Sequence, residues 1–154
     1  MQRPPRTNQP ADPSPYVTPD LPKILAATAI AVVGCSPRPS RTSHRIARYL
    51  LDAGYDVVPV NPFHETILDR RCYPSVAVIG SDAPIGIVNI FRRPAFTAEM
   101  VADAIQWSTN TGTRPVIWTQ LGVSSQAAEE LAQEAGLPYV RNRCIMVEHA
   151  RLSF

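Results

Sequence analysis

The stretch Ala31–Leu50, AVVGCSPRPSRTSHRIARYL, joins an apolar run to a polar, proline-containing loop and then to an amphipathic segment. The run ends at Gly34, and the amphipathic segment predicts a helix over 43–53 with its apolar side chains on one stripe. This order is typical of a βα turn that binds phosphate at the N-terminus of its helix. Because the further glycines of a GxGxxG fingerprint are missing, the loop argues against NAD.

The rest of the chain continues to alternate between strands and helices. Continuous apolar, β-branched runs predict buried strands, and amphipathic runs predict the helices between them. The predicted strands are 29–34, 55–62, 85–91, 115–120 and 137–140, and the predicted helices are 43–53, 94–108 and 124–135. Such alternation predicts an α/β fold of the doubly wound class, with a mainly parallel sheet and helices on both faces.

Helix caps and one ambiguous segment complete the prediction. Thr18 is the predicted N-cap of a short helix that ends near residue 26, and Thr42 or Ser43 is the predicted cap of the helix after the first loop. The segment 65–82 is ambiguous, and we interpret it as a short strand near Ile67 and a short helix over about 75–79.

Composition limits the classes of protein that the chain can belong to. Its 154 residues give room for one domain, its formal charge is +2, and Lys23 is its only lysine. So small a charge argues against a nucleic-acid or membrane partner. Residues 1–17 are rich in proline and predict a disordered tail, which leaves 18–154 as the domain. Without a signal-peptide pattern, and with three widely separated cysteines, we expect a cytoplasmic protein with reduced thiols and no zinc site.

Unusual residues follow the predicted strands, at the edge where parallel sheets bind their ligands. Gly34 allows close approach of the backbone, and the loop after it offers hydroxyls, the cation of Arg41 and a helix N-terminus, all suited to an anion. Asn61 stands where an NAD site has an acid, which argues further against NAD. Adjacent Arg92 and Arg93 repel each other unless an anion or acid compensates them. For each residue alone, a turn-forming or solvated role stays open.

Four segments together resemble the CoA-binding domain family, whose members are small Rossmann-like proteins similar to the CoA-binding part of the succinyl-CoA synthetase alpha subunit. The segments are IAVVGCSPRPSRTSHRIARYLLDAGYDVVPVNP (30–62), IVNIFRR (87–93), VIWTQLGV (116–123) and NRCIMVEHARL (142–152). Each segment alone is a weak signal, and their common order makes the resemblance specific. Asn142 stands where the family often has an acid, so a role that needs a carboxylate there is not expected.

The resemblance implies a Rossmann-like fold with CoA or acyl-CoA lying across the carboxyl ends of the strands. The implied ligand residues are Gly34, Ser36, Pro37, Arg41 and Ser43 around the phosphates, Asn61 and Pro62 beside the nucleotide, Phe91, Arg92 and Arg93 flanking it, and Gln120 and Gly122, with Leu121 between them, toward the pantetheine arm. The pyrophosphate and ribose phosphate of CoA match the clustered arginines.

The sequence predicts a CoA-binding protein without catalytic activity, acting as a carrier, sensor or partner subunit. No histidine has a partner at triad-like or metal-like spacing. Two alternatives stay open: an enzyme that uses CoA thioesters or thiol chemistry at Cys144 or Cys35, and an NAD(P)-binding redox protein. Cys35 is interpreted as a small buried residue, although the neighbouring helix N-terminus would act to lower its pKa. A homodimer or an unknown protein partner also stays open.

Overall fold

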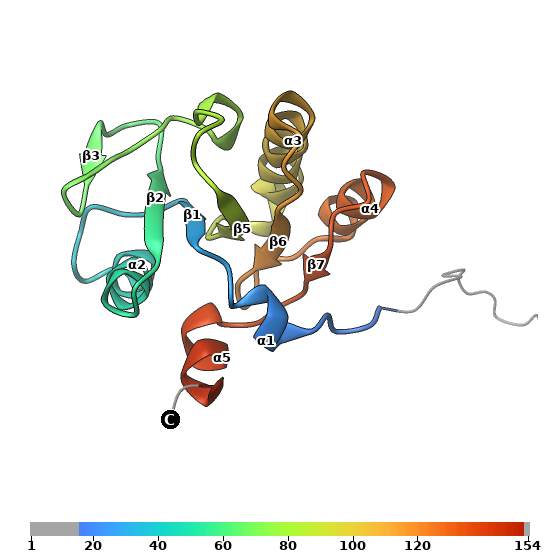
Figure 1. The fold of residues 1–154 in the computed structure, drawn as a ribbon, viewed down its shortest axis with the longest axis horizontal. Coiled ribbons are helices and arrows are strands. Elements are labelled where there is room, and N and C mark those ends of the chain that lie inside the picture. The colour runs from blue at the N-terminus through green and yellow to red at the C-terminus, as the bar shows by residue number, and fades with distance from the viewer. Residues whose placement is uncertain (1–15, 153–154) are drawn as a thin grey trace, which may run out of the picture.

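A computed structural model describes residues 16–152, and residues 1–15 of the predicted tail lie outside this range. The chain forms a five-stranded parallel sheet in the order β2-β1-β5-β6-β7 (Figure 1). The strands are β1 (Ala29–Val33), β2 (Asp56–Val60), β5 (Ile85–Ile90), β6 (Val116–Thr119) and β7 (Tyr139–Val140), and β3 (Thr66–Ile67) and β4 (Arg70–Arg71) form a separate antiparallel pair. The predicted fold class is confirmed.

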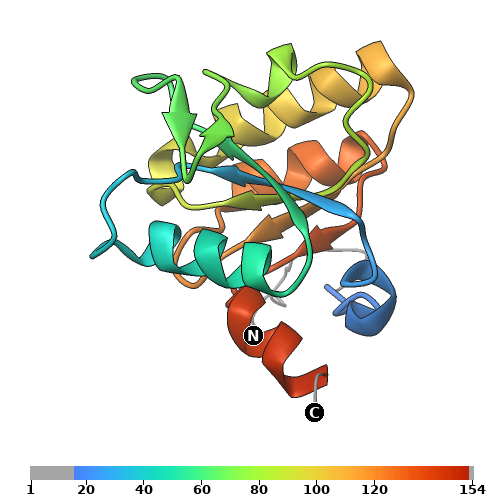
Figure 2. The same cartoon turned by 60° about the vertical axis from the view of Figure 1, so that its left-hand side comes forward.

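Helices cover both faces of the sheet (Figure 2). The helices are α2 (Thr42–Asp52) and α5 (Ile145–Leu152) on one face, α3 (Pro94–Thr111) and α4 (Gln126–Glu134) on the other, and a short α1 (Leu21–Ile24) before the sheet. One turn of 3-10 helix, η2 (Val76–Val78), lies against α3. The ambiguous segment therefore contains a short strand that includes Ile67 and a short helical turn, as predicted.

The central strand β1 explains why the sheet is buried on both faces. All five of its side chains are buried, with Ala31 and Val33 in the core beneath α3 and α4, and Ile30 and Val32 in the core beneath α2 and α5. Side chains alternate between the two faces of a strand, so a run without polar residues suits only a strand that is covered twice.

Strand order reverses between β1 and β5. From β1 the chain crosses to β2 on one side of β1, and then crosses back to place β5 on the other side. Val33 pairs with Val60 of β2 and with Ile90 of β5, so the three strands end level with one another. The residues that follow these strands therefore meet at one edge, where doubly wound sheets bind ligands.

Two predicted helix caps are wrong. Asp20, and not Thr18, caps α1, because its Oδ1 accepts a hydrogen bond from the backbone N–H of Lys23 at 3.3 Å. Neither Thr42 nor Ser43 caps α2, because that helix already includes both residues and Arg41 takes the N-cap position.

Helix α5 was not predicted from the sequence. This helix has eight residues, and Ile145 is the one described as buried, so its apolar pattern is too short to recognise. Near the other end of the chain, Tyr16, which the sequence assigned to the tail, packs against the core beneath α3 and α4. The backbone N–H of Arg141 donates to the Tyr16 hydroxyl at 2.9 Å, and the Arg141 guanidinium lies 4.1 Å from the centroid of the Tyr16 ring.

Candidate functional site

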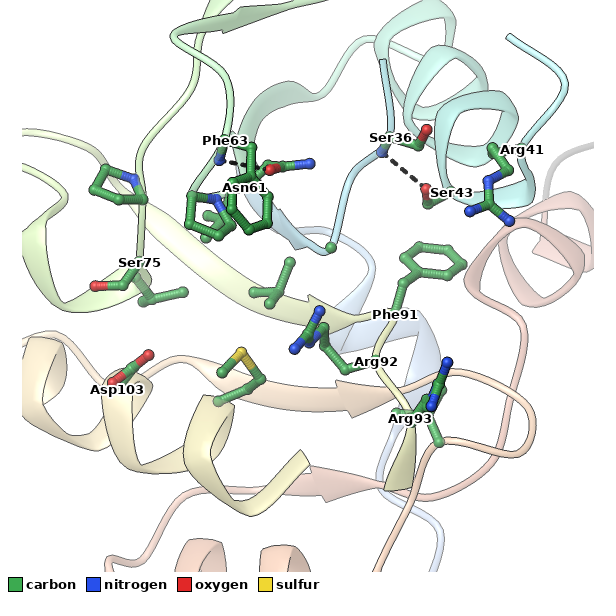
Figure 3. A pocket seen from close by; sticks show the side chains of 18 of the residues that line it. Ser36, Arg41, Ser43, Asn61, Phe63, Ser75, Phe91, Arg92, Arg93 and Asp103 are labelled. Carbon is green, nitrogen blue, oxygen red and sulfur yellow. Dashed lines mark hydrogen bonds between the residues drawn. The ribbon is translucent and has the colours of Figure 1, made fainter. Parts of the chain in front are cut away.

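A cavity of about 680 Å³ opens at the carboxyl ends of β1, β2 and β5, where strand order reverses (Figure 3). This volume is typical of small-molecule and cofactor sites. Most of the ligand residues implied by the sequence line the cavity: Gly34, Ser36, Arg41, Ser43, Asn61, Pro62, Phe91, Arg92, Arg93 and Gly122. The structure thus brings these residues together, while their roles toward a ligand stay predictions.

Two helices begin at this cavity, and each has an arginine at its N-cap. Arg41 precedes α2 and Arg93 precedes α3, and neither helix has a side-chain cap. Ser, Thr, Asp and Asn usually occupy this position because their oxygens accept from the first N–H groups of the helix. A guanidinium accepts nothing, so no side chain at the N-cap satisfies the first N–H groups of α2, and the two helix dipoles add to the positive charge. In α3, Pro94 has no N–H and the N–H of Phe96 donates to the Arg93 carbonyl oxygen at 2.8 Å, so this helix offers fewer free N–H groups. The arrangement suits an anion.

The charge of the cavity arginines is not balanced by carboxylates. Arg41, Arg92 and Arg93 line the cavity, and the ion pairs found within residues 16–152 involve other arginines. The guanidinium of Arg92 lies 4.8 Å from the ring centroid of Phe96, a cation–π contact that holds the side chain over α3. Clustered cations that form no ion pair favour an anionic ligand with several oxygens.

The loop between β1 and α2 is shaped by its own side chains. The backbone N–H of Ser36 donates to Ser43 Oγ at 3.0 Å (Figure 3), and the N–H of Arg38 donates to Ser36 Oγ at 3.1 Å. His44 Nδ1 lies 2.8 Å from the Ser36 carbonyl oxygen, and because a carbonyl only accepts, Nδ1 carries the proton. Both serine oxygens accept from the backbone, so each hydroxyl proton can still be donated to an anion.

Gly34 is required by the meeting of two strands. Its φ is +82°, and a Cβ built on it would lie 2.2 Å from the carbonyl oxygen of Phe91, which follows β5. From the sequence, this glycine was ascribed to close approach of a ligand. The structure adds that only a residue without a side chain lets the ends of β1 and β5 come this close.

Asn61 links two loops of the site. Its Nδ2 donates to the carbonyl oxygen of Cys35 at 2.9 Å, and its Oδ1 accepts from the N–H of Phe63 at 2.9 Å. The side chain therefore ties the loop after β1 to the turn after β2, and this is the turn-forming role that the sequence left open. The turn presents Phe63 at the cavity with 84% of its surface exposed.

Three of the implied ligand residues do not line the cavity. Pro37 and Leu121 are exposed outside its lining, and Gln120 is buried. Gln120 Oε1 instead accepts a hydrogen bond from the N–H of Ile145 at 2.9 Å, at the start of α5. Gln120 therefore stabilises the start of α5, on the face of the sheet opposite α3, and does not face the cavity.

Asn142 has a structural role in place of the acid often found in the family. Its φ is +63°, and its Oδ1 accepts from the N–H of Gly122 at 2.7 Å. Asparagine tolerates the left-handed region better than most residues, and its short amide reaches nearby backbone groups. The contact joins the loops that follow β6 and β7.

The cavity also contains residues to which the sequence did not point. The main ones are Phe63 and Ser75 from the segments after β2 and before η2, and Met100 and Asp103 from α3. Asp103 is the acidic residue of the lining, and it lies on α3 below Ser75, on the opposite side of the view from Arg41 and Arg93 (Figure 3). Its position depends on how α3 packs against η2, and no local motif reveals that packing.

The cysteines differ in their availability for chemistry. Burial raises the pKa of the Cys35 thiol to about 12, and burial also raises the pKa of Cys72. Cys35 is a small buried residue, as predicted, and loss of hydration outweighs any lowering of its pKa by the helix N-terminus. Cys144 is partly exposed, and all three cysteines are free.

Residues 16–152 hold no group of three or more His, Cys, Asp or Glu side chains placed to bind a metal ion. Nor do they include a helix with the length and apolar character needed to cross a bilayer.

The fold and the cavity define a Rossmann-like domain with an arginine-lined cavity at the point where strand order reverses. Comparison with known families agrees with this description. The chain belongs to the CoA-binding domain family, whose model matches residues 28–150.

Some relatives are about as long as this chain, and others are much longer proteins of which it matches only a part. YneT, an uncharacterized protein of Bacillus subtilis (strain 168), is 39% identical over 121 residues, which make up 79% of this chain and 84% of YneT. A hypothetical protein from Pyrococcus horikoshii OT3 is 44% identical, with a TM-score of 0.77 over 86% of this chain and 89% of that chain. The ADP-forming acetate–CoA ligase II of Archaeoglobus fulgidus is 26% identical over 128 residues, which are 82% of this chain and 17% of the ligase.

Proposed function

We propose that this protein binds CoA or acyl-CoA through its domain 18–154, with the nucleotide lying across the carboxyl ends of β1, β2 and β5. The observation that carries the proposal is the convergence of two arginine-capped helix N-termini and arginines without ion pairs on one cavity. A pyrophosphate and a ribose phosphate would occupy this region, where N–H groups and guanidinium groups supply charge-assisted hydrogen bonds. Membership of the CoA-binding domain family supports the choice of ligand.

We further propose that the protein acts without catalysis, as a cytoplasmic carrier, sensor or partner subunit. Two of the three histidines are engaged, since His44 contacts the Ser36 carbonyl and His149 Nδ1 lies 2.8 Å from the Tyr49 hydroxyl. Cys35 is fully buried with a raised pKa. Cys144 alone combines a thiol with exposure, so it is the residue on which the enzymatic alternative depends.

Binding and its chemistry are tested by native mass spectrometry of the purified protein and by calorimetric titration with CoA, acetyl-CoA and NADH. Arg41→Ala and Arg92→Ala should each weaken CoA binding by about 1–3 kcal/mol, the range for a lost charge-assisted hydrogen bond. Arg48→Ala is the matched control, because Arg48 lies on α2 and does not line the cavity.

The possible results separate the alternatives. CoA affinity that is the same in both cavity variants and the control would contradict the assignment of the phosphates. Tighter binding of NADH than of CoA would favour the redox alternative. Turnover of acyl-CoA that is lost in Cys144→Ala would show an enzyme and contradict the non-catalytic proposal.

A further inference from the structure

Asp103 places a carboxylate in a cavity otherwise suited to anions. It lies on α3, on the side of the cavity remote from Arg41 and Arg93 (Figure 3). A carboxylate repels phosphates, so this side of the cavity disfavours the charged part of a nucleotide. The two sides of the cavity thus favour different parts of one ligand.

No group of the described chain compensates the Asp103 carboxylate. Within residues 16–152 it forms neither an ion pair nor a hydrogen bond. Burial raises the pKa of Asp103, and the negative charge of Glu99, one turn earlier on α3, raises it further. A partly buried carboxylate without a donor is unfavourable in the unliganded protein, and a ligand that brings a donor would relieve this cost.

Much of the cavity lining is apolar, and Phe63, like Ser75, lies on the same side of the view as Asp103 (Figure 3). The apolar lining includes Val60, Pro62, Phe63, Pro74, Val76 and Met100. Prolines, a phenylalanine and branched side chains offer contact area without hydrogen-bonding groups, and such walls suit the faces of a planar aromatic base. Asp103, together with the hydroxyl of Ser75, would then meet the polar edge of that base.

We propose that Asp103 accepts a hydrogen bond from the exocyclic amine of adenine in the CoA nucleotide, and so makes the site select adenine over 6-oxopurines. This selectivity rests on the proposed CoA-binding function. The adenine amine is a donor, whereas the same position of hypoxanthine is a carbonyl acceptor that a carboxylate repels. With the arginines holding the phosphates, this second contact also fixes the direction in which the nucleotide lies.

The test compares CoA with the analogue in which hypoxanthine replaces adenine, by calorimetric titration of the full chain. We expect the wild-type protein to bind CoA at least about tenfold more tightly than the analogue, in line with one hydrogen bond to a charged group. In Asp103→Asn the ratio should fall below about threefold, because the asparagine amide can donate to the hypoxanthine carbonyl. Glu99→Gln is the matched control, since it removes a neighbouring charge on α3 outside the cavity lining and should preserve the wild-type preference.

Each outcome bears on one proposal. Equal binding of CoA and the analogue by the wild-type protein would overturn the inference and leave CoA binding intact. A preference that persists unchanged in Asp103→Asn would assign selectivity to another group and overturn it too. If removal of the negative charge acts only by reducing repulsion of the phosphates, both ligands gain equally and the ratio stays constant, which again contradicts base recognition. Absence of CoA binding in the wild-type protein would instead refute the proposed function itself.

Discussion

Replacement of Gly34 by alanine tests whether the cavity floor depends on the close approach of β1 and β5. At φ +82° any residue with a Cβ is strained by about 1 kcal/mol. The new Cβ would also lie 2.2 Å from the Phe91 carbonyl oxygen, while real contacts of this kind are essentially never below 3.0 Å, so the two strands must separate by about 0.8 Å (3.0 − 2.2).

The contact adds a larger cost than the backbone strain. Overpacking between fixed backbone atoms costs about 1–3 kcal/mol. Separation of the strands also stretches the hydrogen bond from the Phe91 N–H to the Val33 carbonyl, which is 2.8 Å long and stabilises the fold by about 1 kcal/mol. We therefore expect Gly34→Ala to lower the free energy of unfolding by at least about 3 kcal/mol, a large share of the stability of a typical domain.

Urea unfolding followed by circular dichroism measures this loss, and Gly112→Ala is the control. Gly112 follows α3 with φ +79°, almost the value at Gly34, but no heavy atom lies within 4 Å of the place that its Cβ would take. The control should therefore lose about 1 kcal/mol, from backbone strain alone. Equal losses in the two variants would refute the argument, because they would show that contact between β1 and β5 contributes nothing.

Two further predictions concern single groups. Iodoacetamide at about pH 7.5 should alkylate Cys144 in the native protein and leave Cys35 unmodified, because Cys35 is fully buried with a pKa of about 12; peptide mass spectrometry showing early alkylation of Cys35 would contradict its buried state. Asp103→Asn should stabilise the unliganded protein at about pH 7, because the pKa of Asp103 is raised in the folded state. Above this raised pKa the wild-type carboxylate is ionised and lowers the free energy of unfolding. As the pH falls below the raised pKa, the carboxylate becomes protonated and this destabilisation is lost. Urea unfolding across pH should show a difference between variant and wild type that shrinks toward acid, and a constant difference would contradict this.

The sheet was predictable because its signal is local. An uninterrupted run such as AIAVV fits only a strand covered on both faces, and the glycine and polar loop behind it mark the turn into a helix. Level strand ends follow from a parallel sheet, and so the sequence could associate Arg92 with Arg41 although 51 positions separate them (92 − 41). The same rule placed Gly122 at the cavity.

The rest depends on packing between segments distant in sequence. Gln120 follows a strand, like the other implied ligand residues. Its side chain, however, lies on the face of the sheet that α5 covers, where it accepts a hydrogen bond from the N–H of Ile145. Its orientation could be predicted only with α5 in view, and that helix has too short an apolar pattern to recognise. Asp103 lies ten positions into α3 (103 − 94 + 1), and only the docking of this helix against η2 brings it to the cavity.

Under the proposed function, ligand binding and stability of the fold make opposing demands on the same cavity residues. An acceptor residue in place of Arg41 or Arg93 would cap its helix and stabilise it by about 1 kcal/mol, and a neutral residue in place of Asp103 would remove a partly buried charge. Each substitution that the folded chain alone would favour would remove a group suited to a bound nucleotide. Arg41, Arg93 and Asp103 are each unfavourable for the stability of the fold, and all three converge on one cavity. A ligand explains these residues more simply than the fold does, since a ligand with phosphates and an amine donor would satisfy all three at once.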